Sequence, residues 1–556
     1  MIVMESPPGT LTTDLPAPMV QRLNHVLCLP LQIACQEQRV TGIDDIVDRL
    51  TKTVGDQGHW KISNGPLPEG LTPEQCWQAQ AYFHPFVRRF LFDSQRTRWL
   101  QRSDVESLQI SLPKTDSLAE QSVRLEVFRC QLALFQPDIA ILLLEVGYNA
   151  TDESKDQKPP LPLHVLQRLL DRLRRVYPPY FDRGKDGVPF GGHCPESATL
   201  CDANGQVIGA AGSYKPADYH ESLRGTRDAN WTPSWSAHWQ SLLAPLLTNG
   251  AQDDGHRLRV RQFGDDRAAI MSYVAFNDPT LLNPGQWVRL CFADDHGNDP
   301  LPYSESFLSG FSRDYCYDRY WYTGIRNGEV IDSRDAPSRV LNCGYAFSYV
   351  GKAGDEFFTC GSSGALFTFR HLYVTMGVVA HFQRANLLAA SHRLTNLVER
   401  GKKGPRLPHV DEVRRFYEQF VEFTQTYWFD ELTPQDQGQQ IFAQWQSHLR
   451  TQRLYDEVRQ ELKDLVEYAE LRASGELNEK VGLFGLAAVL LAVISAIAGI
   501  LGMNKPADWE MSGWIGISGW LEKISWPVSN LSTISIPLLL AVAGILLWIS
   551  LKGRKK

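Results

Sequence analysis

Short apolar runs that alternate with polar residues dominate the first two thirds of the chain. The runs at residues 123–135 and 139–148 are bounded by turn-forming residues, a pattern typical of β-strands. Apolar residues recur three or four positions apart at 73–92 and 163–177, which predicts helices between the strands. Strands and helices in alternation predict an α/β (or α+β) domain over residues 1–370.

Strand signals then stop, and helical patterns follow. Helices are predicted at 371–400 and 410–429, on either side of a segment rich in glycine, proline and lysine. A third run, 434–501, has no proline after its first residue and would be about 100 Å long if it were helical throughout. We therefore expect a helical stalk over residues 371–480.

Two stretches near the C-terminus, 481–501 and 534–551, contain no charged residue. A helix that spans a membrane needs about 20 mainly apolar residues, whereas a packed helix of a globular domain normally keeps a polar face. The sequence therefore predicts two C-terminal transmembrane helices. The expected segments are transmembrane helix 1 at 481–504, an external loop at 505–533, transmembrane helix 2 at 534–551 and a basic cytosolic tail at 552–556.

The distribution of Lys and Arg predicts the orientation of these helices. The tail carries Lys552, Arg554, Lys555 and Lys556, whereas the loop between the two stretches has only Lys505 and Lys523. Basic residues favour the cytoplasmic side. The first residues lack the basic and apolar regions of a signal peptide. The expected localisation is multi-pass in the inner (plasma) membrane, with both termini cytoplasmic.

Composition narrows the protein class. The chain has 556 residues, is 43% hydrophobic and 21% charged, and contains 10 Cys. These values exclude disordered, collagen-like and disulfide-dense proteins. The net charge of −7 argues against a nucleic acid polymer as the main partner.

Motifs of enzymes are missing from the sequence. There is no G-x-x-x-x-G-K-[ST] loop for ATP and no H-E-x-x-H zinc motif, and 361–364 does not have the G-x-S-x-G spacing. His193, Cys194 and Cys201 lack an evident fourth ligand for zinc. His381 and His392, on a predicted helix, are interpreted as packing residues. We expect that the protein is not an enzyme and has no cofactor.

Gly502-Met503-Asn504 stands at the end of the first predicted span. Together with the stalk segment 427–471, the two spans and the basic tail, it resembles the CorA family of divalent metal-ion transporters of the 2-TM-GxN type. The resemblance is good over 427–556, loose from residue 371 and only architectural before that. It implies a homopentamer that moves Mg²⁺, with Co²⁺ or Ni²⁺ as alternatives, passively down its gradient. Mg²⁺ would be substrate and regulator, and the cytosolic domain would gate the channel.

The same resemblance, with helical spacing, gives candidate residues for the ion path. A ring of Asn504 amide oxygens beside Gly502 and Met503 would contact the hydrated ion as a selectivity filter, because Mg²⁺ gives up its water reluctantly. The alternative is a simple helix cap at Gly502 and Asn504. One face of the first span would line the pore, unless its small residues serve helix packing. That face comprises Asn478, Val481, Phe484, Ala488, Ala492, Ser495 and Gly499.

The chain departs from the family pattern after the motif. Lys505 stands where an aromatic residue is usual, and the loop is long and lacks the family's acidic Met-Pro-Glu-Leu segment. Asp508 and Glu510 would then attract the cation from outside. Acidic pairs in the cytosolic domain would act as a cation sensor, unless they are ordinary solvated turns. These are Asp253, Asp254, Asp265, Asp266, Asp294 and Asp295.

Two further functions are left open. One is a Zn²⁺-transporting relative of CorA, against which the intact Gly-Met-Asn sequence is mild evidence. The other is a ligand-gated, CorA-like membrane effector of a nucleotide-signalling defence system, whose partner would be a small nucleotide. The lipid bilayer and divalent cations are the other expected partners.

Overall fold

The computed structural model describes most of the chain between residues 17 and 502. The described ranges are 17–34, 42–51, 59–68, 70–93, 97–114, 118–136, 138–150, 158–177, 193–214, 234–248, 258–264, 266–319, 324–326, 329–331, 338–403 and 410–502. The statements below concern these residues.

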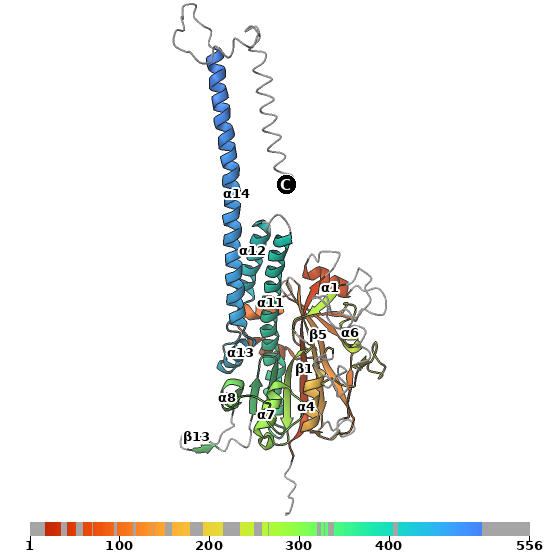
Figure 1. Cartoon of the computed structure of the whole chain (residues 1–556). Helices are drawn as coiled ribbons and strands as arrows, with labels where there is room; N and C mark the ends of the chain where they lie inside the picture. The colour runs from red at the N-terminus through yellow and green to blue at the C-terminus, as the bar shows by residue number, and fades with distance from the viewer. Residues whose placement is uncertain are drawn as a thin grey trace, which may run out of the picture. The chain divides into compact units, whose positions relative to one another are not determined.

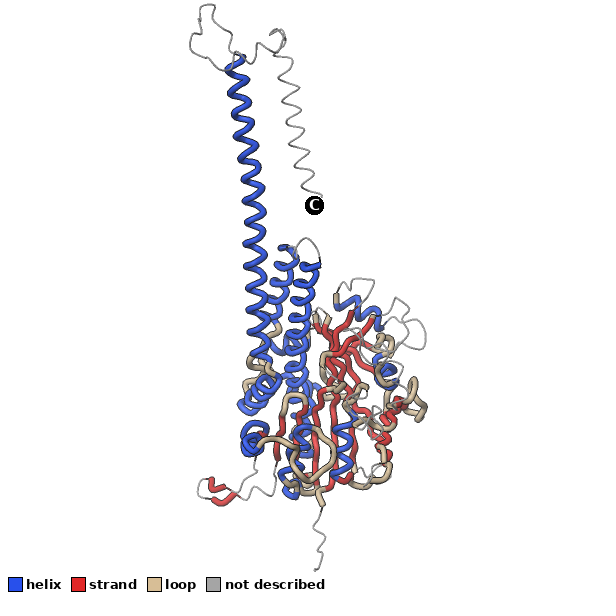
Figure 2. Tube along the Cα trace, in the orientation of Figure 1, coloured by secondary structure: helices blue, strands red, loops and turns tan. Residues whose placement is uncertain are grey.

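Most of the described strands belong to one large sheet of 14 strands. Its strands are drawn in red in Figure 2. Its main strand order is β12-β15-β16-β11-β1-β6-β5-β4-β8-β9, with β10 and β7 paired to β1, and with β3 paired to β5 and β2. The strands are β1 (Met19–Ala34), β2 (Lys61–Ser63), β3 (Thr97–Arg102), β4 (Ser107–Leu112), β5 (Gln121–Phe135), β6 (Ile139–Asn149), β7 (Leu161–Pro162), β8 (Ser197–Cys201), β9 (Gly212–Ser213), β10 (Arg259–Gln262), β11 (Ala269–Phe276), β12 (Cys316–Arg319), β15 (Ser338–Asn342) and β16 (Ala346–Lys352). A separate hairpin is formed by β13 (Gly324–Arg326) and β14 (Glu329–Ile331).

The strand pairs are antiparallel with one exception among the described strands, the parallel pair of β11 and β16. In this pair Ile270 lies opposite Ala346, so both strands begin at the same end of the sheet. Ile270 N donates to the carbonyl of Tyr345 at 2.9 Å. The residues that precede β11 and β16 are therefore neighbours in space, although about 75 positions separate them in the chain.

The described residues also form helices, which Figure 1 draws as coiled ribbons. They are α1 (Ile43–Thr51), α2 (Pro73–Ala81), α3 (Pro85–Phe92), α4 (Leu163–Leu173), α6 (Ala237–Leu243), α7 (Pro284–Phe292), α8 (Glu305–Tyr315), α9 (Glu356–Thr359), α10 (Ala365–Thr368), α11 (Val374–Lys403), α12 (Val410–Thr426), α13 (Asp436–Leu449) and α14 (Thr451–Gly502), with a 3-10 turn at Pro279–Leu281 and a π-helical turn at Phe369–Tyr373.

Alternation along β1 separates two sides of the sheet. Leu27 and Leu29 belong to the buried cluster that also contains α4 and α7 residues. Asn24 points the other way, because successive side chains of a strand face opposite sides. Its amide donates to Glu145, which is paired with Arg370 just before α11. With helices on both faces, β6 is buried along nearly its whole length, which explains its continuous apolar sequence.

The strands predicted at 123–135 and 139–148 are confirmed as β5 and β6. The single helix predicted at 73–92 is instead two helices, α2 and α3. Pro85 is the first residue of α3. Proline has no N–H for a helix interior but fits a helix start, so it divides the run.

The long helix predicted over 434–501 is also two helices. Arg450 has a φ of 53°, in the left-handed region, and ends α13 before α14 begins. The chain separates into two compact units: residues 1–405 with 416–462, and residues 406–415 with 463–556. All features discussed as a site below lie in the first unit.

The prediction of two transmembrane helices, and with it that of a multi-pass ion channel in the inner membrane, is wrong. Across the described part of the chain, no helix combines the length and apolar character needed to cross a bilayer. The uncharged run 481–501 is not a helix of its own but the end of α14, a 52-residue helix whose earlier turns carry many charged residues. The second predicted span, 534–551, the loop at 505–533 and the tail at 552–556 lie outside the described residues.

Candidate functional site: an arginine-lined groove beside an Asp-His-Asp cluster

Helix α4 ends in a dense group of buried charges. Asp171 is fully buried, and its Oδ1 accepts from Arg175 at 3.2 Å and from Arg174 at 3.5 Å. Arg172 donates a hydrogen bond to Asp295 at 2.9 Å, and Arg175 also donates a hydrogen bond to Asp266. Burial alone would raise the pKa of Asp171, but the His193 hydrogen bond and the Arg175 and Arg174 charges hold it below its usual value. Asp171 is therefore the fixed negative charge that orients these arginines.

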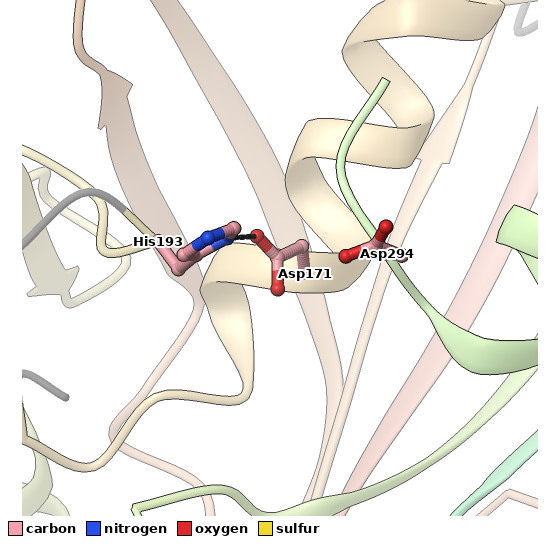
Figure 3. A group of neighbouring side chains, drawn as sticks. All are labelled: Asp171, His193 and Asp294. Atoms are coloured by element: carbon pink, nitrogen blue, oxygen red, sulfur yellow. Dashed lines mark hydrogen bonds and ion pairs between the residues drawn. The ribbon is translucent and has the colours of Figure 1, made fainter. Parts of the chain in front are cut away.

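Asp171 also belongs to a cluster with His193 and Asp294 (Figure 3). His193 Nδ1 lies 2.7 Å from Asp171 Oδ2, while the Asp294 carboxylate approaches from the loop after α7, on the other side of Asp171. Between α7 and Asp294 lies Ala293, which ends the helix and has the left-handed backbone conformation. One donor atom of each side chain lies within 4.8 Å of the others. Burial and the nearby Asp171 charge raise the pKa of Asp294.

The three side chains have donor atoms that suit a divalent cation. Each carboxylate is, however, already paired with a guanidinium: Asp171 with Arg175, and Asp294 with Arg289 at 2.7 Å. The negative charge of the cluster is thus balanced by arginine. Both carboxylates of the cluster therefore hold arginines in place.

Arg174 also lines a pocket of about 430 Å³. Three arginines line it: Arg174 from the end of α4, Arg267 from just before β11, and Arg384 from α11. Phe263, Phe292, Tyr345 and His381 complete much of the wall, and the described lining residues include no carboxylate. The described lining residues therefore bring positive charge to the pocket and no negative charge.

Hydrogen bonds and ring contacts fix two of these arginines in place. Arg174 is buried and donates from Nη2 to the Ala293 carbonyl at 2.9 Å, while its Nε has no hydrogen-bond partner. Arg384 donates to the Leu449 carbonyl, and its guanidinium lies 5.5 Å from the centre of the Tyr345 ring. Tyr345 follows Gly344, whose φ of +88° makes the tight turn between β15 and β16.

A second pocket of about 250 Å³ adjoins the first and shares Phe263, Gly264 and Leu388 with it. Its other walls comprise Gln32, Tyr177, Trp235, Arg261, Gln262 and His392. These walls again include no carboxylate among the described residues. We call the two pockets together the groove.

Helix α11 provides one whole wall of the groove. His381, Arg384, Leu388 and His392 are three or four positions apart, so they form one stripe on the helix. Burial, and then the Arg384 charge, lower the pKa of His381 to about 4. His381 is therefore neutral at neutral pH, and the positive charge of the first pocket comes from its arginines.

The structure places some of the sequence-predicted sensor residues beside this groove. Asp266, Asp294 and Asp295 are each paired with an arginine, as described above. Asp253, Asp254 and Asp265 lie outside the described residues. A role of these acids in sensing a cation stays a prediction.

The predicted ion-path residues either lie on α14 or fall outside the described residues. Phe484, Ala488 and Ala492 are exposed on this helix. Asn478, Val481, Ser495, Gly499 and Gly502 fall within its helical range, and Met503, Asn504, Asp508 and Glu510 lie outside the described residues. Their roles stay predictions.

Sequence reasoning missed the groove. Its main residues, Arg174, Arg267, Tyr345 and Arg384, come from separate segments that meet only in the folded chain. The basic sequence 172–175 and the stripe from His381 to His392 were the available signals, but helical spacing cannot show which face of a helix meets a pocket.

No family model matches the chain, and no curated protein is significantly similar to it. The resemblance to the CorA family, Mg²⁺ as substrate or regulator, and the homopentamer therefore stay predictions.

Proposed function

We propose that the chain is a receptor for a small phosphate-bearing ligand, which binds in the groove. The observation that carries this proposal is the set of three arginines around the first pocket, with no carboxylate among its described lining residues. A guanidinium offers paired N–H donors that match phosphate oxygens, which makes arginine the preferred side chain for phosphate. The volume of about 430 Å³ is within the range of small-molecule sites, about 300–1,000 Å³.

The arginines are also pre-organised. Asp171 and the Ala293 carbonyl hold Arg174, and the Leu449 carbonyl and the Tyr345 ring hold Arg384. A side chain that is already ordered loses less conformational entropy when a ligand binds. These contacts support selective binding rather than loose attraction to an exposed basic surface.

Isothermal titration calorimetry with inorganic pyrophosphate and ADP tests the proposal. Arg267→Gln removes an exposed arginine of the groove, and Arg384→Gln removes one that is half-buried on α11. Each change should weaken binding roughly tenfold or more, because a hydrogen bond to a charged group contributes about 1.5–3 kcal/mol. Arg313→Gln is the matched control, since Arg313 is exposed and paired with Asp314 outside the groove.

Circular dichroism and thermal unfolding of each variant separate lost binding from lost folding. The proposal is wrong if neither ligand binds to the parent chain. It is also wrong if the folded Arg267→Gln and Arg384→Gln variants bind like the parent. Transport of a divalent cation, which the resemblance to CorA predicts, stays a prediction that the described residues do not test.

A further inference from the structure

Two thiols, those of Cys291 and Cys343, meet at the wall of the first pocket. Cys291 is buried in the last turn of α7, whereas Cys343 directly follows β15, is half-buried and lines the pocket. Their side chains are in hydrogen-bonding contact. Close approach of two cysteine side chains is the first requirement for a disulfide bond.

The thiols meet because α7 packs alongside β15. Cys291 lies four positions after Trp287, on the same face of the helix. Cys343 lies four positions after Arg339, which places both on one side of the strand as it ends. The guanidinium of Arg339 lies 4.8 Å from the centre of the Trp287 ring. Two successive contacts therefore join the helix to the strand, and the thiol contact is part of this packing.

The surroundings of the two thiols make them chemically unequal. The hydrogen bond from Cys291, the backbone N–H of Ala346 and the charge of Arg174 lower the pKa of Cys343, against the effect of burial. Burial, and then the neighbouring Cys343, raise the pKa of Cys291. The thiolate is the nucleophilic form of cysteine. Cys343 is therefore the thiol that reacts first, and Cys291 is its protonated neighbour.

Two other cysteines show what sets this pair apart. A buried cysteine commonly packs as a small apolar residue, as Cys316 does in the same apolar cluster, and Cys316 lines neither pocket. Cys360 is open to solvent, and hydrogen bonds with Ser362 and Ser363 lower its pKa to about 6, but these partners are hydroxyls rather than a thiol. Cys343 has both a thiol neighbour and a pocket beside it.

We propose that Cys291 and Cys343 are a redox-active pair, which a peroxide that enters through the first pocket oxidises to a disulfide. The Cys343 thiolate attacks hydrogen peroxide, breaks its O–O bond and becomes a sulfenic acid, with release of hydroxide. The Cys291 sulfur then attacks the Cys343 sulfur and forms the S–S bond. The hydroxide that it displaces takes the Cys291 proton and leaves as water. In sum, two thiols and one hydrogen peroxide give one disulfide and two waters.

Peptide mapping of the full chain tests the proposal directly. The chain is treated with hydrogen peroxide, free thiols are blocked with iodoacetamide, and trypsin is added without a reductant. Trypsin cuts after Lys and Arg, so Cys291, Cys316 and Cys343 fall in the separate peptides 290–313, 314–319 and 340–352. We expect peptide 340–352 joined to 290–313, and their separation by dithiothreitol. A Cys343 that stays a free thiol, or that joins mainly to another peptide, would overturn the proposal.

Cysteine variants test the order of the two steps. Cys291→Ala removes the second thiol, so Cys343 should pass from the sulfenic to the sulfinic acid, which mass spectrometry detects. Cys316→Ala, from the same apolar cluster, is the matched control and should form the 290–313 to 340–352 link like the parent. Circular dichroism shows that each variant is folded. As little sulfinic acid at Cys343 in folded Cys291→Ala as in the parent would contradict the role of Cys291.

The route of the peroxide is tested with inorganic pyrophosphate, and this part rests on the proposed receptor function. Pyrophosphate in the first pocket would cover Cys343 and should slow disulfide formation in proportion to occupancy, about tenfold when nine-tenths of the sites are filled. An unchanged rate in a chain that calorimetry shows to hold pyrophosphate would overturn entry through this pocket. If pyrophosphate does not bind, the receptor function fails, and the peptide map alone decides on the redox pair.

Discussion

Asp171 decides how the arginines beside the groove are arranged. Among the described residues, it is the one carboxylate that reaches both Arg174 and Arg175, and it does so from a fully buried position on α4. A buried charge is tolerated when partners and hydrogen bonds compensate its lost hydration. The same contacts that stabilise Asp171 therefore aim Arg174, a wall residue of the first pocket.

Asp171→Asn should destabilise the fold strongly. Removal of one partner from a buried ion pair typically costs about 3–5 kcal/mol, because the remaining charges are left buried and unpaired. The measurement is the free energy of unfolding from denaturant titration. Asp314→Asn, in an exposed pair with Arg313, is the control and should unfold like the parent. Similar stability of Asp171→Asn and the parent would contradict the role given to this carboxylate.

Protonation of His381 should lower stability on the acid side of neutrality. Burial and Arg384 lower its pKa in the folded chain to about 4, from an ordinary 6.5. Between these values the unfolded chain binds a proton that the folded chain does not, so stability falls as the pH falls through this window. The His381 contribution is at most about 3 kcal/mol.

Unfolding curves of the parent and of His381→Gln at several pH values test this contribution of His381 to stability. His381→Gln should lose less stability than the parent between about pH 6.5 and 4. Other buried histidines, among them His25 and His371, have pKa values lowered to about 3, so some pH dependence will remain in the variant. His392→Gln, exposed on the same helix, is the control. Parallel pH profiles of parent and His381→Gln would contradict the prediction.

At the scale of elements, local sequence patterns predict which helices and strands form, but not which of them pack together. The strands at 123–135 and 139–148 and the helix around 371–400 follow from periodicity, which depends on near neighbours in the chain. The groove depends on the parallel pairing of β11 with β16 and on the side of α11 that faces them. No local signal specifies such pairings. The apolar run 481–501 is the end of α14, in line with the proline-free sequence that predicts one long helix up to residue 501.

The break between α13 and α14 could not be predicted from the sequence, because neither glycine nor proline lies at that point. Arg450 adopts a left-handed conformation there, with a φ of 53°. A residue with a Cβ is strained in this region and glycine is not. Arg450→Gly should therefore raise the free energy of unfolding by about 0.5–1 kcal/mol.

Chemical denaturation of Arg450→Gly and the parent measures the effect. Arg453→Gly, three positions into α14, is the matched control and should lower stability by about 1 kcal/mol, since glycine is unfavourable inside a helix. A loss of stability in Arg450→Gly would show that the arginine side chain contributes more than its backbone strain costs.

At the scale of the whole molecule, the groove belongs to one of two compact units. All its walls come from the first unit, residues 1–405 with 416–462, whereas most of α14 belongs to the second. A ligand stabilises the state that binds it by RT ln(1 + [L]/Kd), about 2.7 kcal/mol at a hundredfold excess over Kd. That stabilisation acts first on the elements that line the groove.

Hydrogen exchange with and without ADP should therefore report on the two units separately. We expect slower exchange in α11 and β10, which line the groove, and in the start of β11. Exchange in residues 463–502 should not change, because none of them lines the groove. The effect should weaken at high salt, since arginine and phosphate attract through charge. Protection that extends into 463–502 would contradict this prediction and would show that ligand binding in the first unit changes the stability of the second.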